Sequence, residues 1–192
     1  MKELEEKILK EGKVYPGHIL KVSSFLNHRI DVEFMVKMGD EIANLYQNTG
    51  ITKILTIEAS GIAIAMAAAI PMHVPVVFAK KSTTSNLNAE LFTTVIHSYT
   101  HNKDYHVVVS KEFLNEADKV LVVDDFLANG AALNGLIDIV HQARAELIGA
   151  AIAIEKGFQK GGDELRDRGV RIESLAIIES MSDDGITFRS DK

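Results

Sequence analysis

The segment VLVVDDFLANGAA, which spans residues 120–132, decides the fold class of this chain. It begins with consecutive apolar residues, continues with Asp124 and Asp125, and ends in a loop of small residues that leads into a helical sequence. An uninterrupted apolar run is typical of a strand covered on both faces, as in parallel α/β sheets. The aspartates and the loop are therefore expected at the carboxyl end of a parallel strand, where open α/β sheets bind ligands.

Further apolar runs on both sides of this segment predict the other strands of the sheet. They occur at residues 54–57, 74–79, 107–109 and 150–154. The helices predicted between them cover residues 62–70, ended by Pro71, and 131–145. A hairpin is predicted from 92–99 and 105–110, and the polar segment 80–89 is predicted to be a flexible loop. We expect an α/β fold with a central, mainly parallel sheet flanked by helices over about residues 51–180.

The N-terminal section, about residues 1–50, has a different pattern. A helix at 2–11 is predicted to place Leu4, Ile8 and Leu9 on one face and to end at Gly12, and a short strand is predicted at 20–22. Asp31 is expected to cap a second helix that runs to about Tyr46. Its predicted buried stripe consists of Phe34, Met35, Met38, Ile42 and Leu45. No linker separates this section from the sheet, so one domain is expected over residues 1–192.

The composition excludes several classes of protein. The 192-residue chain contains no cysteine, which excludes disulfides, cysteine-bound zinc, iron–sulfur clusters and a catalytic thiol. Its longest apolar stretch, residues 62–70, is far shorter than the roughly 20 residues that span a membrane, so we expect a cytoplasmic protein with no membrane partner. The net charge of −6 argues against nucleic acid as a partner, because such binding depends on clustered Lys and Arg.

The loop that ends the opening segment is suited to bind a phosphate. It consists of Ala128, Asn129, Gly130, Ala131 and Ala132. Because these residues have little bulk, their N–H groups can come close to an anion, and the helix that follows adds the positive end of its dipole. The carboxylates of Asp124 and Asp125 suit hydrogen bonds to sugar hydroxyls or, through water, a Mg²⁺ ion. The alternative is that the two aspartates only cap the following turn and helix.

This segment closely resembles the phosphoribosyl-pyrophosphate (PRPP) signature of the type I phosphoribosyltransferases. The usual family pattern has Thr where this chain has Asn129, and commonly Gly or Thr at Ala131 and Ala132, so hydroxyl donors are lost while Asn129 keeps an amide donor. Further segments are similar to those of the xanthine branch of the family. They are LKVSSFLNH (20–28), ITKILTIEASGI (51–62), VPVVFAK (74–80) and IEKGFQ (154–159).

The resemblance implies a fold, an activity and a set of site residues. The fold is that of the type I phosphoribosyltransferases, with an N-terminal hood and a flexible loop. The activity is transfer of the 5-phosphoribosyl group from PRPP to N9 of xanthine, which gives XMP and pyrophosphate in a Mg²⁺-dependent homodimer. The residues implied are Asp124 and Asp125 for catalysis, residues 128–132, Glu58, Ala59, Ser60, Gly61 and Lys81 for PRPP, and Leu20, Asn27 and Lys156 for xanthine.

Other interpretations of these residues stay open. Glu58 to Gly61 follows a predicted strand and could be no more than a tight turn, and the Lys80-Lys81 pair could be a solvated surface feature. The base could be hypoxanthine, guanine or adenine in place of xanthine. A non-catalytic regulator of the same fold, which senses PRPP and binds nucleic acid, is a further possibility, although residues 1–50 carry no excess of positive charge.

Overall fold

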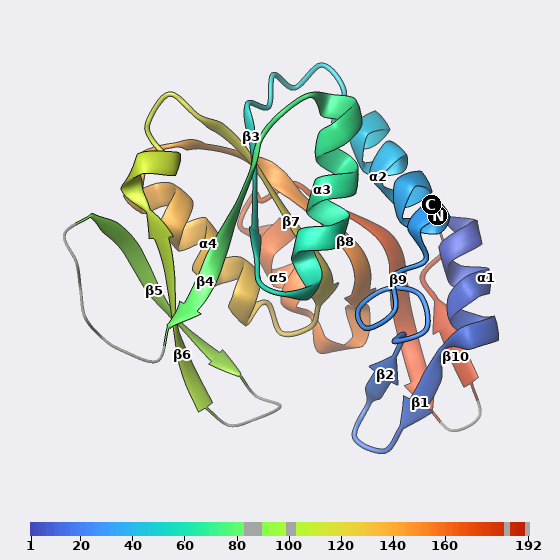
Figure 1. Ribbon diagram of the computed structural model, residues 1–192. Helices are drawn as coiled ribbons and strands as arrows, with labels where there is room; N and C mark the ends of the chain where they lie inside the picture. Colours follow the sequence, from blue (N-terminus) through green and yellow to red (C-terminus); the bar gives the residue numbers. More distant parts are fainter. Residues whose placement is uncertain (83–89, 99–102, 183–184, 191–192) are drawn as a thin grey trace.

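The computed structural model describes residues 1–82, 90–98, 103–182 and 185–190 (Figure 1). Within these residues an eight-stranded sheet has the order β10-β9-β8-β7-β3-β4-β6-β5. Its strands are β3 (Lys53–Ile57), β4 (Val76–Ser82), β5 (Leu91–Ser98), β6 (Lys103–Ser110), β7 (Lys119–Leu127), β8 (Glu146–Lys156), β9 (Ile172–Ser182) and β10 (Gly185–Phe188). Strands β4, β3, β7, β8 and β9 pair in parallel, which confirms the predicted sheet and aligns their carboxyl ends at one edge.

Helices cover both faces of this sheet. They are α1 (Lys2–Glu11), α2 (Val32–Leu45), α3 (Ser60–Met72), α4 (Ala131–Gln142) and α5 (Gly161–Asp167), with short 3₁₀ turns η1 (Lys111–Phe113) and η2 (Gly157–Gln159). Buried side chains of α1, α2 and α3 share one core with the sheet, and those of α4 share a second core with the β5–β6 hairpin. The ribbon shows α2 and α3 side by side, away from α4 (Figure 1).

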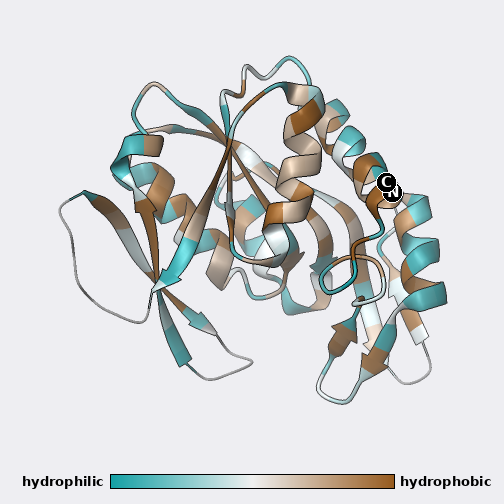
Figure 2. Cartoon of the chain, in the orientation of Figure 1, coloured by the Kyte–Doolittle hydropathy of each residue, from teal (hydrophilic) through white to brown (hydrophobic). Residues whose placement is uncertain are grey.

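The apolar run that opens the 120–132 segment serves both cores. Leu121 and Val123 belong to the core under α3, whereas Val120 and Val122 belong to the core under α4, and all four are fully buried. Successive side chains of a strand point to opposite faces, so a strand buried on both faces needs apolar residues without alternation. The hydropathy colouring shows the same apolar character along the inner strands (Figure 2).

The N-terminal section packs against the sheet through α1, α2 and a hairpin of β1 (Lys13–Tyr15) and β2 (Ile19–Lys21). Helix α1 was correctly predicted, and Leu4 and Ile8 are buried, but Leu9 is 58% exposed and does not belong to the buried face. Asp31 caps α2 as predicted, because its Oδ1 accepts a hydrogen bond from the Phe34 N–H at 3.2 Å. An ion pair between Lys7 Nζ and Asp31 Oδ2 at 2.8 Å ties α1 to the start of α2.

Several predicted boundaries differ from the structure. Pro71 lies within α3 and does not end it, since a proline in the last turn removes only one hydrogen bond and the N–H of His73 closes the helix on Ala69 and Ile70. The predicted loop at 80–89 begins too early: β4 continues through Ser82 because it pairs with β6, and residues 83–89 lie outside the described part of the chain. The strands β9 and β10 and the helix α5 were not predicted.

Candidate active site

A cavity of about 840 Å³ opens at the edge of the sheet where the parallel strands end. Its wall is built from the ends of β3, β4, β7 and β8, from the start of α4, and from the hairpins β1–β2 and β5–β6. The predicted site residues that line it are Glu58, Ala59, Ser60, Gly61, Lys81, Asp124, Asp125, Ala128, Asn129, Ala131, Ala132 and Lys156. The fold therefore brings together residues from four separate stretches of the sequence.

The loop at 128–132 passes from the end of β7 into the first turn of α4. Gly130 has a φ of 83°, a left-handed conformation that favours glycine, and α4 begins at the next residue. The Ala131 N–H donates to the Asn129 side chain at 3.2 Å, and the Asn134 amide donates to the Gly130 carbonyl at 2.9 Å. The first N–H groups of a helix point away from its body, so this end of α4 presents donors and a positive dipole end to the cavity.

The two aspartates lie where β7 reaches the cavity, in contrasting environments. Asp124 is only 6% exposed, and its Oδ1 accepts the Asp125 N–H at 2.9 Å. Burial, followed by the negative charge of Asp125, raises the pKa of Asp124 well above its ordinary value. Asp125 is more open, and its Oδ2 accepts a hydrogen bond from the Asn27 side chain at 3.4 Å. The pair thus places one buried and one partly exposed carboxyl group on the cavity wall.

A second strand-to-helix turn, Glu58 to Gly61, also lines the cavity. It follows β3, and α3 begins at Ser60, so the helix presents its N-terminal end to the cavity as α4 does. The Glu58 side chain accepts the backbone N–H of Lys81 at 2.6 Å, which joins this turn to the end of β4. Gly61 packs closely: a Cβ there would lie 3.0 Å from Asp124 Oδ1 and still closer to Thr56 Oγ1. The turn is therefore fitted directly against the buried carboxyl group.

Lys156, the last residue of β8, also lines the cavity. Its Nζ donates to the His18 carbonyl at 2.9 Å and lies 5.9 Å from the centre of the Phe126 ring. Burial lowers the pKa of Lys156. The His18 ring packs on Phe158 with their centres 5.3 Å apart, so the tip of the β1–β2 hairpin contacts the turn that follows β8.

Three predicted residues do not line the cavity. Asn27 contacts the cavity wall only through its hydrogen bond to Asp125. Gly130 provides the left-handed turn between the loop and α4. Leu20 is 7% exposed and packs in the core, while its neighbours Gly17, His18 and Ile19 line the cavity in its place. The binding roles assigned to these residues stay predictions.

Sequence reasoning missed several residues of the cavity wall. They are Gly17, His18, Ile19, Ile57, Ile96, His97, Tyr105, Val107 and Gln159. His97 is paired with Asp104 at 2.6 Å, and Tyr105 lies beneath the Lys81 ammonium at 5.7 Å from its ring centre. The signal for most of them is weak in sequence, because all except Ile57 and Gln159 belong to hairpins whose position over the sheet is set by tertiary packing.

Comparison with known proteins identifies the family of this chain. Residues 33–185 match the model of the family described as "Phosphoribosyl transferase domain". The chain is 51% identical to a protein of Oceanobacillus iheyensis named xanthine phosphoribosyltransferase, which it matches over 100% of this chain and 98% of the relative. A protein of Lachnoclostridium phytofermentans with the same name is 53% identical over the whole of both chains.

Solved structures agree on the fold. An adenine phosphoribosyltransferase of Trypanosoma brucei superposes with a TM-score of 0.76 at 20% identity, covering 95% of this chain and 82% of the other. The enzyme of Giardia lamblia gives a TM-score of 0.75 at 20% identity, covering 93% and 98% of the two chains. Because the family match spans most of the chain, including the turn at 58–61, the aspartate pair and the loop at 128–132, the chain belongs to the phosphoribosyltransferase family.

Proposed function

We propose that this chain transfers the 5-phosphoribosyl group of PRPP to N9 of xanthine and releases XMP and pyrophosphate in purine salvage. The observation that carries the proposal is one cavity that joins two helix N-termini, an aspartate pair and Lys156, in a chain about 50% identical over its full length to proteins named for this activity. Two separate anion sites suit a substrate with phosphates at both ends, such as PRPP. The net charge of −6 is no obstacle, since backbone N–H groups supply most of the binding.

In this mechanism the chain acts by position and charge, without a covalent intermediate. The N–H groups of residues 128–132 hold the 5′-phosphate, and the turn at 58–61 with Lys81 holds the pyrophosphate that leaves. The carboxyl groups of Asp124 and Asp125 bind the ribose hydroxyls, and their negative charge stabilises C1′ as it becomes cation-like. Xanthine loses its imidazole N–H proton to solvent, and the new C1′–N9 bond forms as the bond from C1′ to pyrophosphate breaks.

A Mg²⁺ ion fits the chemistry of the same wall. The ion prefers oxygen ligands and retains several waters, and Asp124 and Asp125 present carboxylate oxygens beside the place proposed for the ribose and pyrophosphate. We expect it to be bound mainly through PRPP, where it would neutralise the charge of the leaving pyrophosphate. Asp125 is the better placed of the two to hold its waters, because it is the more exposed carboxyl group.

The purine is proposed to lie between the N-terminal section, about residues 1–50, and the end of β8. The Lys156 ammonium, which donates to the His18 carbonyl in this structure, would donate to a carbonyl oxygen of xanthine. Asn27 and Leu20 would complete the base site from the N-terminal section, with Asn27 offering both a donor and an acceptor. Xanthine carries oxygens at C2 and C6, so the arrangement favours it over adenine, which has neither.

Lys156→Ala and Asn27→Ala are expected to weaken use of the base more than use of PRPP. Each change removes a hydrogen-bonding group from the proposed base site and leaves the loop at 128–132 in place, so the KM for xanthine should rise about 10-fold, the effect of losing one hydrogen bond to a charged or buried group. Steady-state kinetics with each substrate varied in turn measure this split. Equal loss for xanthine and PRPP would remove both residues from the base site.

Incubation of the protein with PRPP, Mg²⁺ and one purine at a time tests the activity itself. We expect XMP from xanthine at the highest kcat/KM, and less product or none from hypoxanthine, guanine and adenine. A higher kcat/KM with another base would identify that base as the substrate in place of xanthine. No nucleotide from any base, together with salt-sensitive binding of DNA or RNA, would favour the regulator of the same fold.

A homodimer in the cytoplasm is proposed as the working state. Helix α3 leaves Met66 and Ile70 59% and 63% exposed, four residues apart on one face, and an apolar helix face of this kind suits burial against a second copy. In the part of the chain that the structure describes, no helix is long and apolar enough to cross a membrane.

A further inference from the structure

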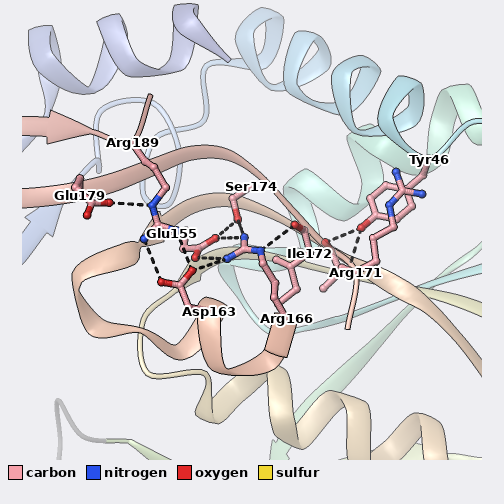
Figure 3. Close-up of polar contacts among 10 residues, drawn as sticks. Tyr46, Glu155, Asp163, Arg166, Arg171, Ile172, Ser174, Glu179 and Arg189 are labelled. Carbon is pink, nitrogen blue, oxygen red and sulfur yellow. Dashed lines mark hydrogen bonds and ion pairs between the residues drawn. The ribbon is translucent and has the colours of Figure 1, made fainter. Parts of the chain in front are cut away.

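An ion pair between the buried Glu155 and the partly exposed Arg166 lies next to Lys156 at the end of β8. Glu155 is fully buried, and its carboxylate accepts two hydrogen bonds from the Arg166 guanidinium, at 2.8 and 2.6 Å, and another from the Ser174 hydroxyl (Figure 3). Gly162 makes room for it, since a Cβ at that position would overlap the carboxylate. The fork of Arg166 fixes the orientation of the carboxylate as well as its position.

Glu155 of this pair lies next in sequence to the lysine that lines the cavity. Glu155 and Lys156 are adjacent at the end of β8, and neighbouring side chains of a strand point to opposite sides. Glu155 points into the protein towards α5, whereas Lys156 lines the cavity. The two residues share one stretch of backbone, so a displacement of that backbone at Glu155 would also displace Lys156.

Helix α5, which carries Arg166, also contacts the loop at 128–132. This loop is proposed to bind the 5′-phosphate and is called the phosphate loop below. The first residue of α5, Gly161, donates its N–H to the Ala128 carbonyl at 3.2 Å, and a Cβ at Gly161 would lie only 2.6 Å from the Gly130 nitrogen. Leu165, which is 1% exposed, packs close behind Gly130. The seven residues of α5 thus contact the loop at one point and hold the end of β8 at another.

A second set of ion pairs joins α5 to the C-terminal segment and to β9. Asp163 on α5 pairs with Arg189 at 2.8 Å, and Arg189 pairs with Glu179 on β9 at 2.8 Å (Figure 3). Arg189 also packs close to Gly157, the residue after Lys156. The turn after β8 is therefore held from two sides, by α5 and by the C-terminal segment.

From this geometry we propose that Arg166 is a positioning residue, which, through Glu155 and α5, sets the distance between the Lys156 ammonium and the phosphate loop at 128–132. A nucleotide must reach both at once, with its phosphate in the loop and its base at Lys156. The inference rests on the proposed function, because it takes Lys156 as a base-binding residue. Ligands that touch only the loop should not depend on Arg166.

Stability alone is a weak reason for this arrangement. Replacing a buried ion pair by apolar residues of similar size is often neutral or stabilising, whereas removing one partner leaves a buried charge and is strongly destabilising. The comparison of a single and a double variant therefore separates position from stability. Arg166→Met leaves Glu155 unpaired, and Glu155→Gln with Arg166→Met leaves no buried charge at the site.

The experiment measures dissociation constants of XMP and of ribose 5-phosphate, which carries the phosphate without the base, for the full-length protein. We expect the double variant to lose about 10-fold in XMP affinity, the effect of losing one hydrogen bond from a charged group, while ribose 5-phosphate changes by less than about 2-fold. Arg166→Lys, which keeps the charge and loses the fork, should lie between wild type and the double variant.

Lys53→Met is the matched control. The Lys53 side chain is 13% exposed and pairs with Asp118 at 2.9 Å where β3 and β7 begin, at the opposite ends of these strands from the cavity. Loss of this ion pair should lower the melting temperature without changing either dissociation constant. A folded double variant that binds XMP as wild type does, or that loses XMP and ribose 5-phosphate to the same extent, would overturn the inference. The proposed function is tested separately, by XMP formation in the wild-type protein.

Discussion

Asp124→Asn is expected to make the protein more stable at neutral pH and nearly inactive. The carboxyl group is buried beside Asp125, and both effects raise its pKa above the ordinary value of about 4. A raised pKa means that folding favours the protonated form, so the stability that this group contributes is complete below about pH 4 and is lost as the pH rises through the raised pKa. Asparagine keeps a similar shape without the charge. The variant should therefore not lose this stability as the pH rises.

The catalytic effect should have the opposite sign. In the proposed mechanism the negative charge of Asp124 stabilises the cation-like C1′, and asparagine cannot supply it. Removal of one group aimed at developing charge lowers kcat on the order of 10²- to 10³-fold. Urea unfolding between pH 4 and 8 measures the stability, and XMP formation measures the activity. A variant whose unfolding free energy has the same pH dependence as wild type would contradict the assignment of the raised pKa to this group.

Asp118→Asn is the control for this experiment. Asp118 is also a buried carboxylate, 8% exposed, and it lies just before the other end of β7. It accepts hydrogen bonds from Lys53 Nζ and from the Asn115 N–H, both at 2.9 Å, so its charge is compensated. Asparagine there leaves the Lys53 ammonium with a weakened partner and should lower stability, with kcat unchanged. Two carboxyl groups at the two ends of one strand are thus expected to respond in opposite directions.

The part of the site that the residues alone predict best lies on one continuous stretch of sequence. The run from Val120 to Ala132 contains a strand buried on both faces, the aspartate pair and the loop before α4, and the order of these parts along the chain is their order in space. The carboxyl ends of parallel strands meet at one edge, so this run also indicated where the cavity would be. The family resemblance extends the prediction to the turn at 58–61, Lys81 and Lys156, which also line the cavity.

The parts that were not predictable depend on packing between distant residues. Lys80 and Lys81 are polar and were assigned to a loop, but pairing with Val108 and Val107 of β6 holds them in β4. Glu155 and Arg166 are 11 positions apart and no sequence motif joins them, so their pairing becomes visible only when α5 packs against the end of β8. Leu20 shows the same dependence on packing. Neighbouring side chains of the short strand β2 point to opposite sides, so Ile19 lines the cavity while Leu20 is buried in the core.

Gly161→Ala is expected to lower kcat/KM for PRPP about 100-fold, the second of the two largest effects. The new methyl group would meet the backbone of Ala128, Asn129 and Gly130, and backbone atoms cannot move aside as the end of a flexible side chain does. The loop must therefore shift, and a displacement of about 1 Å in a group that positions a substrate can cost about 100-fold in rate. Ribose 5-phosphate should bind more weakly as well, because the change acts on the phosphate loop itself.

Gly169→Ala separates this effect from a general loss of stability. Gly169 follows α5, has a φ of +87°, and has open space around the position of a Cβ, so alanine there is strained by roughly 1–2 kcal/mol without contacting the loop. Both variants should have lower melting temperatures, but only Gly161→Ala should lose affinity for ribose 5-phosphate. This response differs from that of the Arg166 variants, which should lose XMP and keep ribose 5-phosphate. If Gly161→Ala binds ribose 5-phosphate as wild type does, α5 does not support the phosphate loop, and the link from that loop through Arg166 to Lys156 fails with it.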